Sequence, residues 1–179
     1  MKGIVFTEFL ELVEDKFGIE TVEQIISDSD LESKGVYTAV ETYKFTEMVS
    51  LLTNLSNLTK ISPNDLLKVY GLHFFDVLVQ NYGNILKNYK TPLELLESID
   101  AHIHVAVRKL YPDAELPYFE VAKTSDNTLT MTYHSSRAMY AFAHGLMEKT
   151  FEHYNQKATI NYQLLKEDGT IVKFQIVKE

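Results

Sequence analysis

Cysteine is absent from all 179 residues of the chain. This absence excludes disulfide bonds, thiolate-ligated haem, iron–sulfur clusters and zinc sites built on cysteine. The seven glycines are scattered and form neither a P-loop nor a Gly-x-Gly-x-x-Gly pattern, and Gly-x-Ser-x-Gly is missing as well. Acidic pairs such as Glu94 and Glu97 are typical of a solvated helix face. The sequence therefore carries no signature of an enzyme.

Positive charge and long apolar runs are also scarce. Lys and Arg number 17 against 25 Asp and Glu, which gives a net charge of -8. This balance argues against broad nucleic-acid binding and against an anionic membrane surface. No apolar run reaches membrane-spanning length, and Glu8 and Glu11 interrupt the apolar pattern of the first residues, which therefore do not form a signal peptide. We expect a soluble, cytoplasmic protein.

Apolar and aromatic residues are abundant. Hydrophobic residues make up 45% of the chain, which includes 11 Tyr and 10 Phe. The length is that of one domain with a sizeable core. So many aromatic side chains suit a fold that surrounds something large and flat, and they equally suit a fold that simply packs densely.

The first two-thirds of the chain shows apolar residues at helical spacing. Helices are predicted at about residues 4–17, 19–26, 43–58, 63–78 and 92–110. Ser62 before Pro63 and Thr91 before Pro92 are typical helix starts, because each places an N-cap ahead of a proline in the first turn.

The periodicity changes after residue 112. Tyr118 to Ala122 and Leu129 to Tyr133 alternate around a polar turn, and Ala158 to Leu164 and Ile171 to Val177 do the same, which predicts two hairpins. One long helix is predicted between them, from Arg137 to about Tyr154. Helices first and an antiparallel sheet last predict an α+β fold.

The stretch Tyr133-His134-Ser135-Ser136-Arg137 offers three hydrogen-bond donors. If Tyr133 and Ser135 lie at the end of a strand, alternation puts both on one face, close to Arg137 at the start of the next helix. Arg pairs bidentately with a carboxylate, and two hydroxyls can bond its remaining lone pairs. The stretch predicts a carboxylate-binding site. The alternative is a strand end whose polar residues face water.

Two histidines of the predicted helix at residues 92–110 are candidate ligands. His102 and His104 point about 200° apart on a helix, so only one of them can face the core. The apolar stripe of the helix does not decide which one is buried.

Together these segments resemble the H-NOX family, the haem nitric oxide/oxygen-binding domains, in its stand-alone bacterial form. The resemblance starts at Met1-Lys2-Gly3-Ile4-Val5 and continues through Ile103 to Tyr111, which is similar to the family's proximal helix. Leu116-Pro117 and the Tyr-x-Ser-x-Arg pattern follow, with the Pro 13 residues and the Tyr 29 residues after His104.

The resemblance implies a single non-covalent haem b (iron protoporphyrin IX) with His104, not His102, as the proximal iron ligand. Tyr133, Ser135 and Arg137 would hold the haem propionates, and Pro117 would press on the macrocycle and distort it. Distortion is one way in which a protein tunes haem reactivity.

The distal side departs from the oxygen-binding members, which carry a Tyr where this chain has Phe142. Phe9 and Phe74 replace other parts of their hydrogen-bonding network. Bound dioxygen needs a hydrogen-bond donor, whereas nitric oxide does not. The resemblance therefore implies a sensor that binds nitric oxide and carbon monoxide and discriminates against oxygen. Tyr140 lies about 200° from Phe142 on a helix and should point away.

The resemblance also implies a mechanism and a partner. Nitric oxide would weaken the iron–His104 bond, and the helical part, about residues 1–60, would rotate relative to residues 61–179. The single domain would regulate a separate histidine kinase, diguanylate cyclase or phosphodiesterase and would not itself be an enzyme. Two alternatives are an oxygen-binding haem protein and a haem-free interaction module with His104 in its core.

Overall fold

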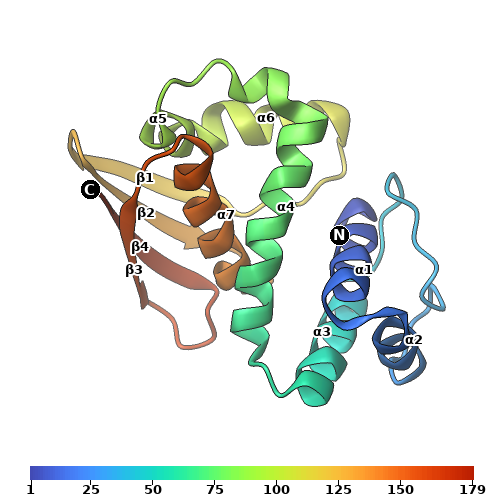
Figure 1. Cartoon of the computed structure of the whole chain (residues 1–179). Coiled ribbons are helices and arrows are strands. Elements are labelled where there is room, and N and C mark those ends of the chain that lie inside the picture. The colour runs from blue at the N-terminus through green and yellow to red at the C-terminus, as the bar shows by residue number, and fades with distance from the viewer. The chain divides into compact units, whose positions relative to one another are not determined.

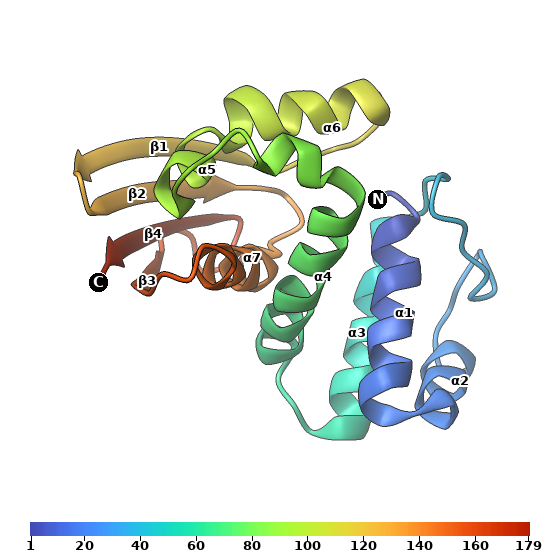
Figure 2. The ribbon, with the colours of Figure 1, turned by 45° about the horizontal axis from the view of Figure 1, so that its top comes forward.

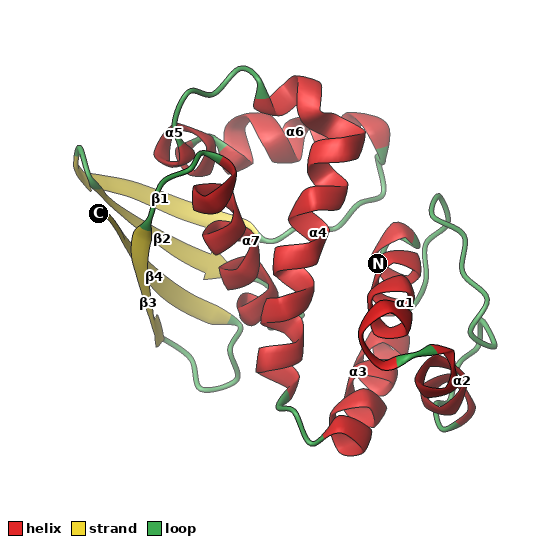
Figure 3. Ribbon diagram, viewed as in Figure 1, coloured by secondary structure: helices red, strands yellow, loops and turns green.

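The computed structural model describes residues 1–179 and divides them into two compact units, Met1–Tyr70 and Gly71–Glu179. The first is helical and the second contains the sheet (Figures 1 and 3). The predicted division at about residue 60 lies close to this boundary, and the prediction of one haem-binding domain over the whole chain stays a prediction. The α+β class is confirmed.

Helices α1 (Ile4–Phe17), α2 (Ile19–Ser27) and α3 (Phe45–Thr59) form the first unit together with the first turns of α4 (Pro63–Leu86). Gly18 separates α1 from α2 at a φ of 87°, a left-handed conformation that favours glycine. Ser62 caps α4, since its Oγ accepts a hydrogen bond from the Asp65 N–H at 3.1 Å.

The loop between α2 and α3 is held by a buried carboxylate. Ser33 and Tyr37 donate hydrogen bonds to Glu47 at 2.5 and 2.8 Å, so the buried charge is compensated. The Tyr37 ring stacks on Phe6 with centroids 4.5 Å apart. Burial raises the pKa of the Tyr37 phenol well above its usual range.

At the far end of the loop, the Gly3 N–H donates to the Glu41 carbonyl at 2.7 Å.

The second unit is built on a four-stranded antiparallel sheet in the order β1-β2-β4-β3. Its strands are β1 (Tyr118–Ser125), β2 (Thr128–His134), β3 (Ala158–Leu164) and β4 (Ile171–Lys178), so both predicted hairpins are confirmed. Alternate residues of β2 and β4 are buried and form one core face: Leu129, Met131, Tyr133, Val172, Phe174 and Ile176.

Helices cover this sheet in two groups (Figures 1 and 2). Helix α7 (Tyr140–His153) packs on β3, while α5 (Pro92–Glu97) and a π-helical turn (Ile99–Ile103) pack on β1. Helix α6 (His104–Leu110) continues directly from that turn. No helix of the chain combines the length and the apolar character that crossing a membrane requires.

Three predicted helix boundaries were wrong. The helix predicted at residues 92–110 is divided by the π-helical turn, in which the His104 N–H bonds back to the Ile99 carbonyl. Helix α7 begins at Tyr140 instead of Arg137, because Ala138 adopts a left-handed φ of 51° that interrupts helical geometry. Helix α4 extends past residue 78 to Leu86, with one non-helical residue at Tyr82.

Substituting Gly3→Ala tests the packing of the loop against α1. An added Cβ would lie 1.7 Å from the Thr38 carbonyl oxygen, and the Gly3–Glu41 hydrogen bond fixes this backbone. We expect the free energy of unfolding to fall by about 1–3 kcal/mol in denaturant titrations. The control is Gly83→Ala in α4, where an added Cβ meets nothing within 4 Å. It should be neutral or stabilise by roughly 0.5–1 kcal/mol. If both variants were equally stable, the close approach of Gly3 to the Thr38 carbonyl would be contradicted.

Candidate functional site

His104 is buried at the start of α6, and its ring is held by a carboxylate. Its Nδ1 lies 2.5 Å from Asp100 Oδ1, within the preceding π-helical turn. The second oxygen of Asp100 accepts a hydrogen bond from the Phe119 backbone N–H, also at 2.5 Å. Burial lowers the pKa of His104, and the hydrogen bond to Asp100 acts in the opposite direction. A neutral imidazole that donates from Nδ1 keeps a lone pair on Nε2, the atom that can bind a metal.

Phe119 connects His104 to the strand end that carries Tyr133. The centroid of its ring lies 6.2 Å from that of His104 and 5.6 Å from that of Tyr133, with the latter pair edge-to-face. Phe119 pairs with Tyr133 in the sheet, and Tyr133 pairs with Val172. Two predicted site residues from distant segments therefore meet around one buried aromatic ring.

Tyr133 and Ser135 organise the turn that follows β2. The buried Tyr133 hydroxyl accepts a hydrogen bond from the Met139 N–H at 2.9 Å, and Ser135 Oγ accepts one from the Arg137 N–H at 3.2 Å. Burial raises the pKa of Tyr133, an effect that hydrogen bonds from Ser135 and Met139 and the charge of Arg137 reduce. Ser135 lies one residue beyond the strand, where its N–H donates to the Thr170 carbonyl.

The guanidinium of Arg137 holds a carboxylate. Its Nη1 donates to the Glu115 backbone carbonyl at 2.8 Å, and its Nη2 pairs with the Glu115 carboxylate. The Arg137 side chain is only 17% exposed, whereas that of Glu115 is 82% exposed. Arg137 thus presents its donors to an acid that lies at the surface. Glu115 belongs to the loop between α6 and β1 that also contains Pro117.

Phe74 and Phe142 come together where α4 and α7 cross. Their ring centroids lie 5.5 Å apart. The crossing is close because an added Cβ on Gly71 would lie 2.2 Å from the Phe142 carbonyl oxygen and 3.1 Å from Gly145 Cα. Phe9 lies in the other unit, where it is buried against Tyr70 with centroids 5.4 Å apart.

Tyr140 and His102 point away from this site, as predicted. The ring of Tyr140 packs on Tyr162 with centroids 5.4 Å apart, on the side of the sheet. His102 is exposed, and its Nδ1 lies 3.1 Å from the Tyr89 hydroxyl. A second phenol contact, between Tyr82 and Tyr111 at 3.0 Å, also joins the end of α4 to the α6 segment.

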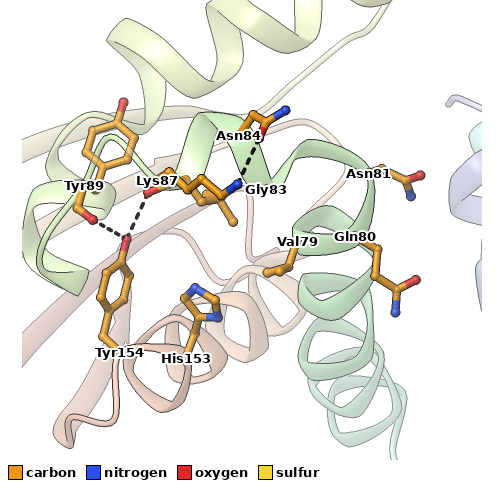
Figure 4. Close-up of a pocket in the computed structure, with 10 residues that line it drawn as sticks. Val79, Gln80, Asn81, Gly83, Asn84, Lys87, Tyr89, His153 and Tyr154 are labelled. Atoms are coloured by element: carbon orange, nitrogen blue, oxygen red, sulfur yellow. Dashed lines mark hydrogen bonds between the residues drawn. The ribbon is translucent and has the colours of Figure 1, made fainter.

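A separate hollow of about 440 Å³ lies at the end of α4, between residues 79–89 and the end of α7 (Figure 4). The Tyr154 hydroxyl closes one side of it by donating to the Tyr89 carbonyl at 3.1 Å. None of the predicted site residues lines this hollow.

A comparison of the chain with protein families agrees with this arrangement of an imidazole, a strand end that binds a carboxylate, and apolar rings. The model of the haem-NO-binding family matches residues 2–162. The chain belongs to this family. H-NOX proteins are haem-binding gas-sensor domains and are generally not catalytic.

Solved H-NOX structures resemble the chain over its whole length. The Fe(II) unliganded H-NOX protein from K. algicida is 59% identical with a TM-score of 0.98, and the match covers 100% of this chain and 97% of that one. The H-NOX from Shewanella woodyi, solved with bound IWP-051 in the Fe(II)CO state, is 35% identical with a TM-score of 0.84, covering 100% and 95%. No curated protein matches the chain.

The Fe(II)NO H-NOX protein from S. oneidensis is 22% identical with a TM-score of 0.92, and the match covers 100% of this chain and 99% of that one. At this identity the likeness shows the fold alone.

The residues present fit a haem. The buried His104 offers Nε2 while Asp100 occupies Nδ1, and the Arg137 fork already binds a carboxylate, here that of Glu115. A single imidazole with a free Nε2 suits a metal whose other ligands come from a macrocycle.

Sequence reasoning missed Asp100, Phe119 and Glu115. Asp100 had one signal, its position four residues before His104, which on a helix places two side chains on one face. Phe119 alternates with Val121 like any strand residue. Nothing in the sequence links Glu115 to Arg137, because they are 22 residues apart in irregular segments.

Substituting Tyr133→Phe tests the hydrogen bond that orders the turn. Without the hydroxyl oxygen, the buried Met139 N–H loses its acceptor, and we expect the free energy of unfolding to fall by about 1–3 kcal/mol. Tyr162→Phe is the matched control, since Tyr162 is 48% exposed. The two variants are compared in denaturant titrations. Equal effects would show that the Met139 hydrogen bond does not stabilise the turn.

Proposed function

We propose that the chain is a haem b sensor that binds nitric oxide at ferrous iron and discriminates against oxygen. The observation that carries this proposal is the buried His104, whose Nδ1 is occupied by Asp100 at 2.5 Å so that Nε2 is left for iron. When bound, haem would supply a ferrous iron with one open position for a diatomic gas. Membership of the haem-NO-binding family and the carbon monoxide state of the S. woodyi relative support this choice.

The propionates would bind at the turn after β2. Arg137 would form a bidentate charge-assisted pair in place of its bonds to the carbonyl and the carboxylate of Glu115, and the hydroxyls of Tyr133 and Ser135 lie at the end of β2 and just beyond it. Pro117 lies two residues before Phe119, whose N–H is bonded to the Asp100 that holds His104. Pro117, proposed to distort the macrocycle, would therefore act close to the proposed proximal ligand.

Apolar side chains would form the distal pocket. Phe74 and Phe142 are in ring contact and offer no hydrogen-bond donor, and the nearby Tyr140 faces Tyr162 instead. Phe9 is the third apolar residue that we assign to this pocket, as the family resemblance implies. A pocket without a donor disfavours bound dioxygen, which accumulates negative charge, and leaves nitric oxide binding unaffected.

The output would be carried to a separate protein, a histidine kinase or a cyclic-di-GMP enzyme. The division of the chain into the units Met1–Tyr70 and Gly71–Glu179 supports a two-state device in which the units rotate relative to each other. Such a device responds to nitric oxide only if the ligand binds the two states with different affinity.

Absorption spectra of the reduced protein under argon, in air, and with nitric oxide or carbon monoxide test the proposed gas selectivity. We expect both nitric oxide and carbon monoxide to bind and no stable oxygen complex to form in air. The variant Phe142→Tyr adds a donor hydroxyl beside Phe74 and should gain an oxygen complex that the parent lacks. A stable oxygen spectrum of the parent would keep the haem but refute the selectivity.

Haem content of His104→Gly tests the proximal ligand. This variant should lose haem during purification and recover it when imidazole is supplied, because free imidazole can enter the space of the missing ring. His102→Gly is the control and should retain the parent spectrum, since His102 is exposed and bonded to Tyr89. If His104→Gly kept the parent spectrum, the ligand assignment would be wrong.

A further inference from the structure

The geometry points to Asp100 as a positioning residue that sets the donor strength of His104 and ties it to the first strand. This inference rests on the proposed role of His104 as the proximal ligand and goes beyond it. Three groups are involved: the Asp100 carboxylate lies between His104 Nδ1 and the Phe119 N–H, and each of its oxygens makes one contact of 2.5 Å.

The first step concerns the tautomer of His104. A carboxylate only accepts hydrogen bonds, so the Nδ1 that faces Asp100 must carry the proton. The lone pair is then on Nε2. The ring is also held from rotating, because Phe119 packs on it with centroids 6.2 Å apart. Asp100 therefore selects which nitrogen is available and in which direction it points.

The second step concerns the other oxygen of Asp100. Strand β1 is at the edge of the sheet, so its outward N–H groups have no neighbouring strand to bond. The carboxylate takes the N–H of Phe119, whose side chain is buried between His104 and Tyr133. Asp100 is thus fixed from both sides, and its side chain is only 23% exposed. A carboxylate fixed in this way cannot rotate away from the imidazole.

The third step concerns the charge. A hydrogen bond to a carboxylate gives the imidazole partial imidazolate character and makes Nε2 a stronger donor than a bond to a neutral acceptor does. A stronger donor stiffens the iron–histidine bond. It also favours ferric over ferrous iron, because added electron density on the ligand stabilises the more positive ion. Asp100 would accordingly lower the reduction potential.

The test compares the haem-loaded parent with Asp100→Asn, which keeps the shape and removes the charge. The iron–histidine stretching band of the ferrous protein, measured by resonance Raman spectroscopy, should move to lower frequency, and the midpoint potential should become more positive. Haem loss to a competing acceptor should become about 10–100-fold faster. Asp100→Glu restores the charge and should move the frequency and the potential back toward the parent values.

Glu97→Gln is the matched control, because it removes one exposed carboxylate from the preceding helix α5. It should leave the frequency and the potential unchanged. A purely structural role of Asp100 would change stability alone, so an unchanged band and potential in Asp100→Asn would overturn the inference. If the parent itself showed no iron–histidine band, the proposed function would fail instead.

Discussion

The buried imidazole of His104 and the N–H of Phe119, the buried residue of edge strand β1, both need a hydrogen-bond acceptor, and one carboxylate serves both. Without Asp100, the Nδ1 of His104 and the N–H of Phe119 would both lack a partner in a largely apolar environment, at a cost of roughly 1–3 kcal/mol each. The carboxylate itself is acceptable there because it receives two strong hydrogen bonds. The π-helical turn, the start of α6 and the edge of the sheet are therefore fixed relative to one another by a single side chain.

The crossing of α4 and α7 depends on backbone contact instead. Gly71 and Gly145 let α4 and α7 approach so closely that Phe74 and Phe142 meet three residues away from each glycine. The surroundings of His104 are thus polar, whereas the contact between Phe74 and Phe142 is apolar. The proposed function uses both features, since it assigns His104 to the iron and the two phenylalanines to the pocket for the gas.

Much of the fold could be predicted because its patterns are local. Alternation of Leu129, Met131 and Tyr133 identified β2, and Ser62-Pro63 identified the start of α4. The helix boundaries that were predicted wrongly depend on the backbone conformation of single residues, such as the left-handed Ala138. Apolar periodicity does not determine such a conformation. The residues proposed to bind haem come from the resemblance to the H-NOX family, because the helical pattern alone left His102 and His104 undecided. Asp100 and Glu115 were missed because an acid on a helix or loop is usually solvated, and only the tertiary structure brings them to His104 and Arg137.

Glu115 occupies the guanidinium of Arg137, the group proposed to bind a haem propionate. A propionate that binds at Arg137, as proposed, would compete with the Glu115 carboxylate for Nη2, and the free energy of that exchange would be subtracted from the affinity for the cofactor. Because Glu115 is largely in water, the deduction is small. In the absence of a cofactor, the half-buried cation of Arg137 has Glu115 as its counter-ion. Glu115 would then serve as the counter-ion of Arg137 until a ligand carboxylate replaces it.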